Sequence, residues 1–195
     1  MYDMGVYPIQ GVRMGTGMEP IAVISAKTST NRPEIYKDGL DEIAIATLEF
    51  PGGVIADIKT SFAENINFLN IACDKGEIKI APYQQYAGVR GTSPLGEINF
   101  PYDVPWQQAK QMDDDCLSIM NGQPMQVPGE EGQRDIRIVQ AVYAAARTGQ
   151  QQKLWTARRL RALPMKILEI RNSKKIIEKI GHVNLLSPLQ DGWDA

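Results

Sequence analysis

An acidic residue and a tyrosine near the start of the chain stand at a spacing that could support proton-transfer chemistry. Asp3 and Tyr7 are four residues apart, so on a helix they would lie on one face, close enough to act together. A phenol can donate or accept a proton when its surroundings lower its pKa from about 10. An exposed capping Asp3 beside a half-buried structural Tyr7 would show the same spacing, so the pair alone leaves both interpretations open.

A second group of aromatic and polar residues lies near the middle of the chain. It consists of Tyr83, Tyr86 and Arg90. Aromatic faces and a guanidinium group suit polyol ligands, so these residues could line a sugar pocket. Ordinary packing of an edge strand is the alternative explanation.

Several other site types are excluded or disfavoured. No GxGxxG motif follows a predicted strand, and no phosphate-binding loop of the GxxxxGK[ST] type occurs. With 2 Cys and 1 His, the chain cannot build a disulfide framework, a His-rich metal site or a His-based triad. Both cysteines are expected to be reduced and buried. The acidic run 113–115 is typical of a solvated helix face, so we predict no metal site.

The element that carries the first pair is predicted to be a short helix over residues 3–15. Val6, Ile9 and Val12/Arg13 recur at helical spacing, and Pro8 is tolerated only within the first turn. Strand patterns follow. They cover residues 19–29, 41–50, 54–63, 67–74, 77–82, 86–91 and 96–100. Short Gly-containing turns join several of them into hairpins, which predicts an open, mostly antiparallel sheet.

The segment 43–50 is apolar on both faces. Ile43 and Ile45 alternate with Ala44, Ala46 and Leu48. Because both faces would then need cover, we expect helices on one side and a second domain or another copy of the sheet on the other.

Two longer helices are predicted after the strands, over residues 104–121 and 130–148. Their apolar stripes consist of Ala109, Met112, Cys116 and Ile119/Met120 in the first, and of Ile136, Val139, Val142/Tyr143 and Ala146 in the second. Such stripes face the core in an amphipathic helix, so both helices are expected to pack on one face of the sheet. Glu130 and Glu131 complement the dipole of the second helix.

Composition and charge narrow the class of protein. The 195 residues are 43% hydrophobic and 23% charged, which excludes a disordered, collagen-like or coiled-coil chain. No run approaches the roughly 20 apolar residues of a membrane span. The first residues lack the features of a signal peptide. We expect a cytoplasmic protein, or a periplasmic one if an upstream export signal exists.

The net charge of −2 hides an asymmetry along the chain. Residues 150–195 hold 9 Lys/Arg and 4 Asp/Glu, so the remainder is acidic and we expect no nucleic-acid partner for it. Residues 151–195 form an appended basic segment with a possible amphipathic helix over 166–180. Its basic face could meet anionic lipid or nucleic acid, but a solvated helix or an oligomer contact is preferred.

Three segments together resemble a known family. They are DMGVYPIQGVRMGTGMEPIAV, the strand pair around EFPGG, and PGEEGQRDIRIVQAVYAAARTGQ. They are similar to the C-terminal domain of the Gfo/Idh/MocA oxidoreductases, particularly the glucose-fructose oxidoreductase branch, over residues 3–150. The resemblance implies that residues 1–150 are a substrate and oligomerisation domain of α+β fold. Its open, mostly antiparallel sheet would have helices on one face and be followed by the basic helical appendage.

The resemblance also implies an activity. Family members pass a hydride between a sugar or polyol and NADP or NAD, which an N-terminal Rossmann domain binds. The sheet of the C-terminal domain pairs with a second subunit, which implies a homo-oligomer. Asp3 matches the residue that positions the sugar, and Tyr7 matches the proton donor or acceptor, where many relatives have His.

Two departures limit the expected activity. The family's Glu-Lys-Pro segment and its Rossmann domain do not occur in this sequence, and residues from about 154 do not resemble the family. We therefore expect a substrate-binding and assembly domain of a sugar or polyol oxidoreductase that binds no cofactor and does not turn over alone. The alternative is a non-catalytic oligomerising scaffold that binds a sugar or a partner protein.

Overall fold

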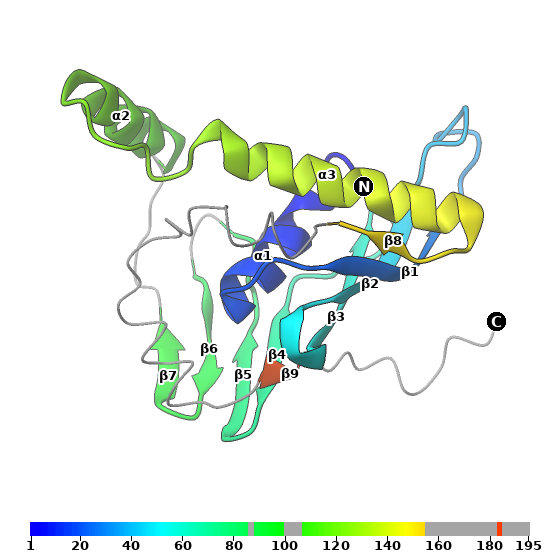
Figure 1. Ribbon diagram of the computed structural model, residues 1–195, viewed down its shortest axis with the longest axis horizontal. Coiled ribbons are helices and arrows are strands. Elements are labelled where there is room, and N and C mark those ends of the chain that lie inside the picture. Colours follow the sequence, from blue (N-terminus) through cyan, green and yellow to red (C-terminus); the bar gives the residue numbers. More distant parts are fainter. Residues whose placement is uncertain (86–87, 100–106, 155–182, 185–195) are drawn as a thin grey trace.

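The computed structural model describes residues 1–85, 88–99, 107–154 and 183–184 of the chain. These residues form an α+β fold in which helices accompany antiparallel strands (Figure 1), as the sequence predicts. The strands divide into two sheets instead of the single open sheet that we expected. The predicted helix over 166–180 lies outside the described residues.

The first sheet has the strand order β3-β2-β1-β8, and every neighbouring pair is antiparallel. Its strands are β1 (Ala22–Ser29), β2 (Ile43–Glu49), β3 (Ile55–Ser61) and β8 (Gln152–Lys153). The turn between β2 and β3 is the short 3₁₀ segment η1 (Pro51–Gly53), in which Gly52 and Gly53 have positive φ. Such angles favour glycine, which is why PGG closes the hairpin.

The second sheet has the order β7-β6-β5-β4-β9 and is also antiparallel. Its strands are β4 (Leu69–Cys73), β5 (Gly76–Ile80), β6 (Arg90–Ser93), β7 (Gly96–Asn99) and β9 (Val183–Asn184). The predicted hairpin over 67–82 corresponds to the pair β4–β5, and the strands predicted at 86–91 and 96–100 correspond in their described parts to β6 and β7. Fewer of its side chains are buried than in the first sheet.

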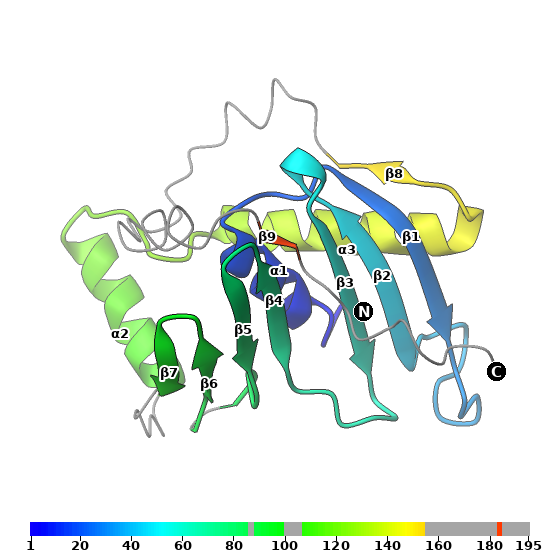
Figure 2. The ribbon, with the colours of Figure 1, turned by 90° about the horizontal axis from the view of Figure 1, so that it is seen from below.

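The helix α3 (Gly129–Thr148) lies across the first sheet and contacts β1 (Figure 2). The core is made of alternate residues of β2 and β3 together with one side of α3. It includes Ala44, Ala46, Leu48, Ala56, Ile58, Ile138, Val139 and Val142, all buried. The residues between these on the strands, such as Ile43 and Ile45, are only half-buried. Among the residues that the structure describes, the expected cover is therefore found on one face of the sheet.

The helix α1 (Val6–Thr16) lies between the two sheets and also touches α3 (Figure 2). Its apolar side chains Ile9 and Val12 are buried in the core. Pro8 is the third helical residue, where a backbone N–H has no intrahelical acceptor, so its ring is tolerated. Gly17 ends the helix in the left-handed conformation.

The stripe that we predicted for α3 is confirmed at Val139 and Val142, which are buried, but not at Ile136. Ile138 is completely buried, whereas Ile136 is 38% exposed. Spacing of three and four residues fits several neighbouring stripes equally well, and contact with β1 selects the one that contains Ile138. The helix itself and its stop at Gly149 agree with the sequence.

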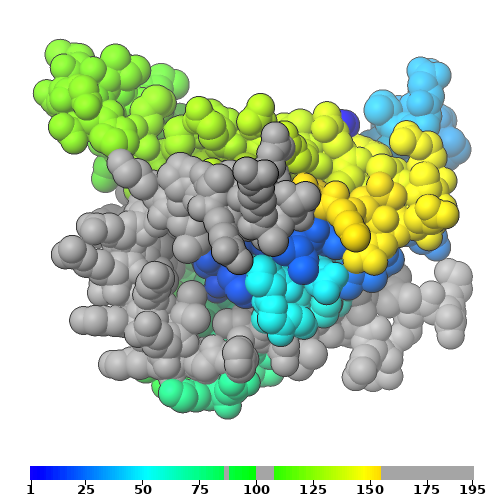
Figure 3. Space-filling model, in the orientation of Figure 1, coloured from blue at the N-terminus to red at the C-terminus, as the bar shows by residue number. Residues whose placement is uncertain are grey.

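The stripe that we predicted for the earlier helix does not reach the core. In α2 (Gln107–Met120), the side chains of Met112, Ile119 and Met120 are 64%, 69% and 80% exposed. The helix stands beyond one end of α3, away from the first sheet (Figures 1 and 3). Both cysteines are free, but Cys116 on this helix is exposed and Cys73 is only partly buried, so the expectation of two buried thiols is also wrong.

Candidate active site

The acid and the phenol singled out in the sequence lie where the chain enters α1. Asp3 lies in the turn that precedes the helix, and Tyr7 is its second residue. Both side chains are exposed, Tyr7 to 51%. The turn is closed by a backbone hydrogen bond of 2.9 Å from the Gly5 N–H to the Met1 carbonyl. The two groups are therefore presented to solvent from an ordered helix start.

One side of the later part of α1 is buried, in contrast to its start. Ile9 is 0% exposed, Val12 is 4% exposed and Arg13 is 2% exposed. Because the helix is held on several sides, the position of its first turn follows from the packing of the later turns.

Tyr83 reaches this helix from the loop that follows β5. Its hydroxyl donates a hydrogen bond to the backbone carbonyl of Tyr7. Its own backbone N–H donates to Oδ1 of Asn67 at 2.8 Å. Burial raises the pKa of the Tyr83 phenol above its ordinary value, so the hydroxyl keeps its proton and remains a donor.

The other two members of the central group are Tyr86 and Arg90. Tyr86 lies outside the described residues. Arg90 begins β6 with an exposed side chain, and its backbone carbonyl accepts a hydrogen bond of 2.9 Å from Ala81. Of the three residues expected to line a sugar pocket, the structure therefore brings Tyr83 to the backbone of Tyr7.

A buried ionic cluster at the far end of α1 was missed by sequence reasoning. The guanidinium of Arg13 contacts Glu19 at 2.7 Å, Glu131 at 2.8 Å and Asp135 at 2.5 Å. Gln10 donates to Asp135 at 3.0 Å. A signal was available, since an arginine stood within the apolar stripe predicted for this helix. Its partners on α3 could not be identified from spacing.

The pKa values in this cluster reflect burial among several charges. Burial alone would lower the pKa of Arg13, but Glu19, followed by Asp135 and Glu131, outweighs burial and raises it. Desolvation raises the pKa of Asp135 although Arg13 acts in the opposite direction. The cluster fixes α1 on α3, and its buried groups are not exposed to a substrate.

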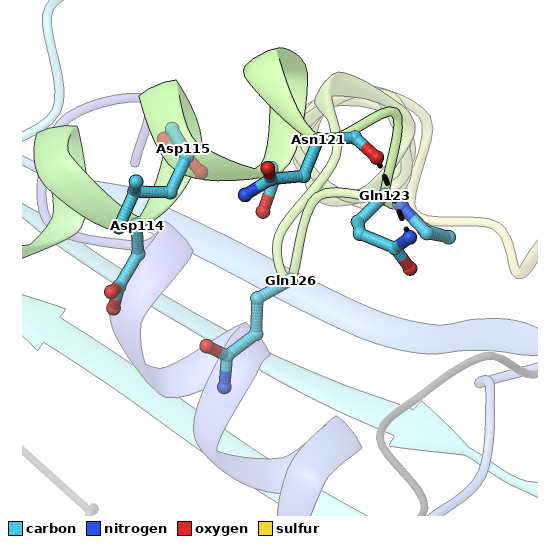
Figure 4. A pocket seen from close by; sticks show the side chains of 8 residues that line it. Asp114, Asp115, Asn121, Gln123 and Gln126 are labelled. Carbon is cyan, nitrogen blue, oxygen red and sulfur yellow. Dashed lines mark hydrogen bonds between the residues drawn. The ribbon is translucent and has the colours of Figure 1, made fainter.

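A separate cavity of about 340 Å³ lies along α2 and the loop that follows it (Figure 4). Its polar lining includes Asp114, Asp115, Asn121, Gln123 and Gln126. No residue of α1 contributes to it. Across the described ranges, no group of three or more His, Cys, Asp or Glu side chains could hold a metal ion. The cavity therefore does not belong to the site around Tyr7.

Part of this chain matches a known family model, and the chain resembles several solved structures. Residues 1–79, which contain the whole of α1 and the first five strands up to most of β5, match the family model described as the GFO/IDH/MocA C-terminal domain. The aldose-aldose oxidoreductase from Caulobacter crescentus, crystallised with glycerol, is 31% identical with a TM-score of 0.67. The match covers 78% of this chain and 46% of that one.

Two further solved structures share the fold at lower identity. The myo-inositol 2-dehydrogenase from Lactobacillus plantarum is 19% identical, with a TM-score of 0.59 and coverage of 78% of this chain and 48% of that one. The scyllo-inositol dehydrogenase from Lactobacillus casei, with bound NAD(H) and scyllo-inositol, is 21% identical, with a TM-score of 0.55 and coverage of 78% and 47%. The chain spans about half the length of each of these structures.

The α+β fold of this chain is shared with the matching parts of these three structures. More specifically, residues 1–79 match the GFO/IDH/MocA C-terminal domain, in agreement with the family resemblance seen in the sequence. No helix among the residues that the structure describes is both long and apolar enough to cross a membrane.

Proposed function

We propose that this chain contains the substrate-binding and assembly domain of an NAD(P)-dependent oxidoreductase that acts on sugars or polyols. The expected domain boundary at residue 150 falls too early, because β8 (Gln152–Lys153) pairs with β1 in the first sheet, so only residues after β8 are proposed as an appended segment. The observation that carries this proposal is the contrast along α1. Ile9, Val12 and Arg13 of the helix are buried, yet Asp3 and Tyr7 at its start are exposed. The likeness to the aldose-aldose oxidoreductase supports the substrate class.

In this proposal the two exposed side chains act on one hydroxyl of the substrate. Asp3 accepts a hydrogen bond from the sugar and orients it. Tyr7 donates its phenolic proton to the carbonyl oxygen during reduction and takes the proton back during oxidation. The nicotinamide supplies or accepts the hydride at the same carbon when it is bound.

The nucleotide is assigned to another polypeptide segment for a topological reason. Dinucleotide-binding units are built from parallel strands with a Gly-rich turn leading into a helix. Every strand pairing that the structure describes in this chain is antiparallel. We therefore expect the chain alone, with NADP and glucose, to give no change in nicotinamide absorbance.

The experiment joins this chain to a nucleotide-binding domain and measures NAD(P)H formation with a panel of sugars and polyols. Tyr7→Phe should lower kcat by about 10²–10⁴-fold, the usual contribution of a general acid or base. Asp3→Ala should raise KM and lower kcat. Tyr2→Phe is the matched control, because Tyr2 is 52% exposed, close to the value for Tyr7. The kcat of this control variant should equal that of the parent.

The second candidate is a non-catalytic oligomerising scaffold that binds a sugar or a partner protein. The half-buried Ile43, Ile45 and Ile55 on the outer face of the first sheet favour an assembly role, which the first proposal shares. An unchanged rate in both Tyr7→Phe and Asp3→Ala would favour the scaffold over the enzyme.

Assembly is tested separately from catalysis. A second copy on the outer face of the sheet would cover Ile45, which lies opposite Lys27 and Lys59 on the neighbouring strands. Sedimentation at micromolar concentration should show an oligomer, and Ile45→Asp should shift it toward monomer. A strictly monomeric parent chain would contradict the assembly role.

A further inference from the structure

The backbone of α1 meets the second sheet directly on one side. Gly11 and Gly15 are four residues apart, so they lie on the same face of the helix. A Cβ atom at Gly15 would lie 2.6 Å from Cδ1 of Ile71 on β4, and one at Gly11 would overlap the hydroxyl of Tyr83. The absence of side chains at these two positions lets the sheet and the tyrosine approach the helix backbone.

The hydroxyl of Tyr83 lies against one turn of the helix backbone. It donates to the carbonyl of Tyr7 and sits where a Cβ atom of Gly11 would be. The carbonyl of Tyr7 and the N–H of Gly11 are the pair that an α-helix joins between residues i and i+4. The phenol of Tyr83 is thus fixed to the turn that begins with the candidate proton donor.

Tyr83 is itself held in place by an amide side chain. Oδ1 of Asn67 accepts hydrogen bonds from the backbone N–H of Tyr83 at 2.8 Å and of Gln84 at 2.6 Å. Nδ2 of Asn67 donates to the carbonyl of Gln84 at 3.2 Å. Because one side chain binds both residues, the loop that carries Tyr83 cannot move away from α1 without losing several hydrogen bonds.

We propose that Tyr83 is a positioning residue for Tyr7: its hydroxyl, admitted by Gly11 and held by Asn67, fixes the first full turn of α1 against the second sheet. This inference rests on the proposed function, in which Tyr7 transfers the proton. It also replaces the substrate contact that we expected for Tyr83, because the hydroxyl is engaged with the helix backbone. Positioning matters here because a displacement of about 1 Å can cost a catalytic group about 10²-fold in rate.

The test compares Tyr83→Phe, which keeps the ring and removes the hydroxyl, with Tyr36→Phe. Tyr36 lies on the loop between β1 and β2 and is also partly buried. In the complete chain, amide hydrogen exchange at Gly11, followed by NMR, should become at least about 10-fold faster in Tyr83→Phe. It should be unchanged in Tyr36→Phe. Exchange rates equal to those of the control would overturn the inference.

Kinetics in the chain joined to a nucleotide-binding domain separate positioning from a purely structural role. Tyr83→Phe should lower kcat by about 10-fold or more while KM changes by less than about 3-fold, since the variant alters proton transfer and not substrate binding. Loss of kcat in Tyr7→Phe but not in Tyr83→Phe would overturn this inference alone. An unchanged kcat in Tyr7→Phe would overturn the proposed function and, with it, this inference.

Discussion

Helices α2 and α3 have similar sequence patterns and opposite surroundings. Both carry apolar residues at helical spacing, and both end at a glycine with positive φ, Gly122 and Gly149. Yet Ile138 on α3 is 0% exposed and Ile119 on α2 is 69% exposed. The amphipathic pattern therefore predicted both helices correctly but did not tell which of them has a surface to pack against.

The difference arises from contacts made by other elements. Among the described residues, α3 contacts α1, β1 and β8, and its Glu131 and Asp135 bind Arg13 in α1. Its Tyr143 donates a hydrogen bond to Asp41. The stability of α3 should therefore depend on tertiary contacts, whereas that of α2 should depend mainly on helix propensity. Four predictions test this contrast.

Replacing Arg13 by Met should have the largest effect. The side chain is 2% exposed and lies among three carboxylates. Removing one partner of a buried ionic cluster leaves the others uncompensated, so we expect a loss of about 3–5 kcal/mol in the free energy of unfolding, measured with urea. Arg147→Met, on the exposed last turn of α3, should change it by less than about 0.5 kcal/mol. Similar losses in both variants would refute the role of the cluster.

The same substitution on the two helices gives the most direct comparison. Ile138→Ala should destabilise the chain by about 3 kcal/mol, because it removes buried methyl groups and leaves a cavity. Ile119→Ala should alter stability by no more than about 0.5 kcal/mol, since its side chain is exposed. Both values come from urea unfolding curves. A loss above about 1 kcal/mol at Ile119 would mean that the stripe on α2 is covered in solution.

Alkaline pH should weaken the attachment of α3 through Tyr143. Burial, together with Asp41, raises the pKa of this phenol above its ordinary value of about 10. Its contribution is therefore complete below about pH 10 and is lost as the pH rises through the raised pKa. Tyr143→Phe should cost about 1.5 kcal/mol at neutral pH, as expected for a hydrogen bond to a charged group.

The pH dependence provides the control for this prediction. The melting temperature of the parent chain should fall more steeply than that of Tyr143→Phe above pH 10, while Tyr36→Phe should follow the parent. Parallel curves for the parent and Tyr143→Phe would show that the phenol does not contribute.

The smallest effect on stability is expected from modifying Cys116. This thiol on α2 is exposed, whereas Cys73 on β4 is partly buried. Desolvation, with a contribution from Asp74, raises the pKa of Cys73 and lowers its thiolate fraction. Maleimide labelling at pH 7.5, followed by mass spectrometry, should be about 10-fold faster at Cys116. The singly labelled chain should keep its unfolding free energy within about 0.5 kcal/mol, and faster labelling of Cys73 would contradict the structure.

In the candidate site, too, the sequence predicted what depends on neighbouring residues and missed the contacts between distant ones. The spacing of Asp3 and Tyr7 and the position of Pro8 placed the pair at a helix start, as the structure has it. The contact between Tyr83 and Tyr7 joins residues 76 positions apart, and that between Arg13 and Asp135 joins residues 122 apart. Nothing in the local pattern identifies such partners, because residues at any distance along the chain can meet in the fold.

The sequence by itself determined the three described helices, the clearest hairpins and the position of an acid and a phenol near the start of the first helix. Each of these depends on interactions between residues a few positions apart, which spacing and turn chemistry record. Only the tertiary structure decided that the strands form two sheets, that Ile138 rather than Ile136 is buried, and that α2 stands apart from the core. These outcomes depend on which surfaces remain to be covered once all elements pack together, and no segment of the sequence specifies that alone.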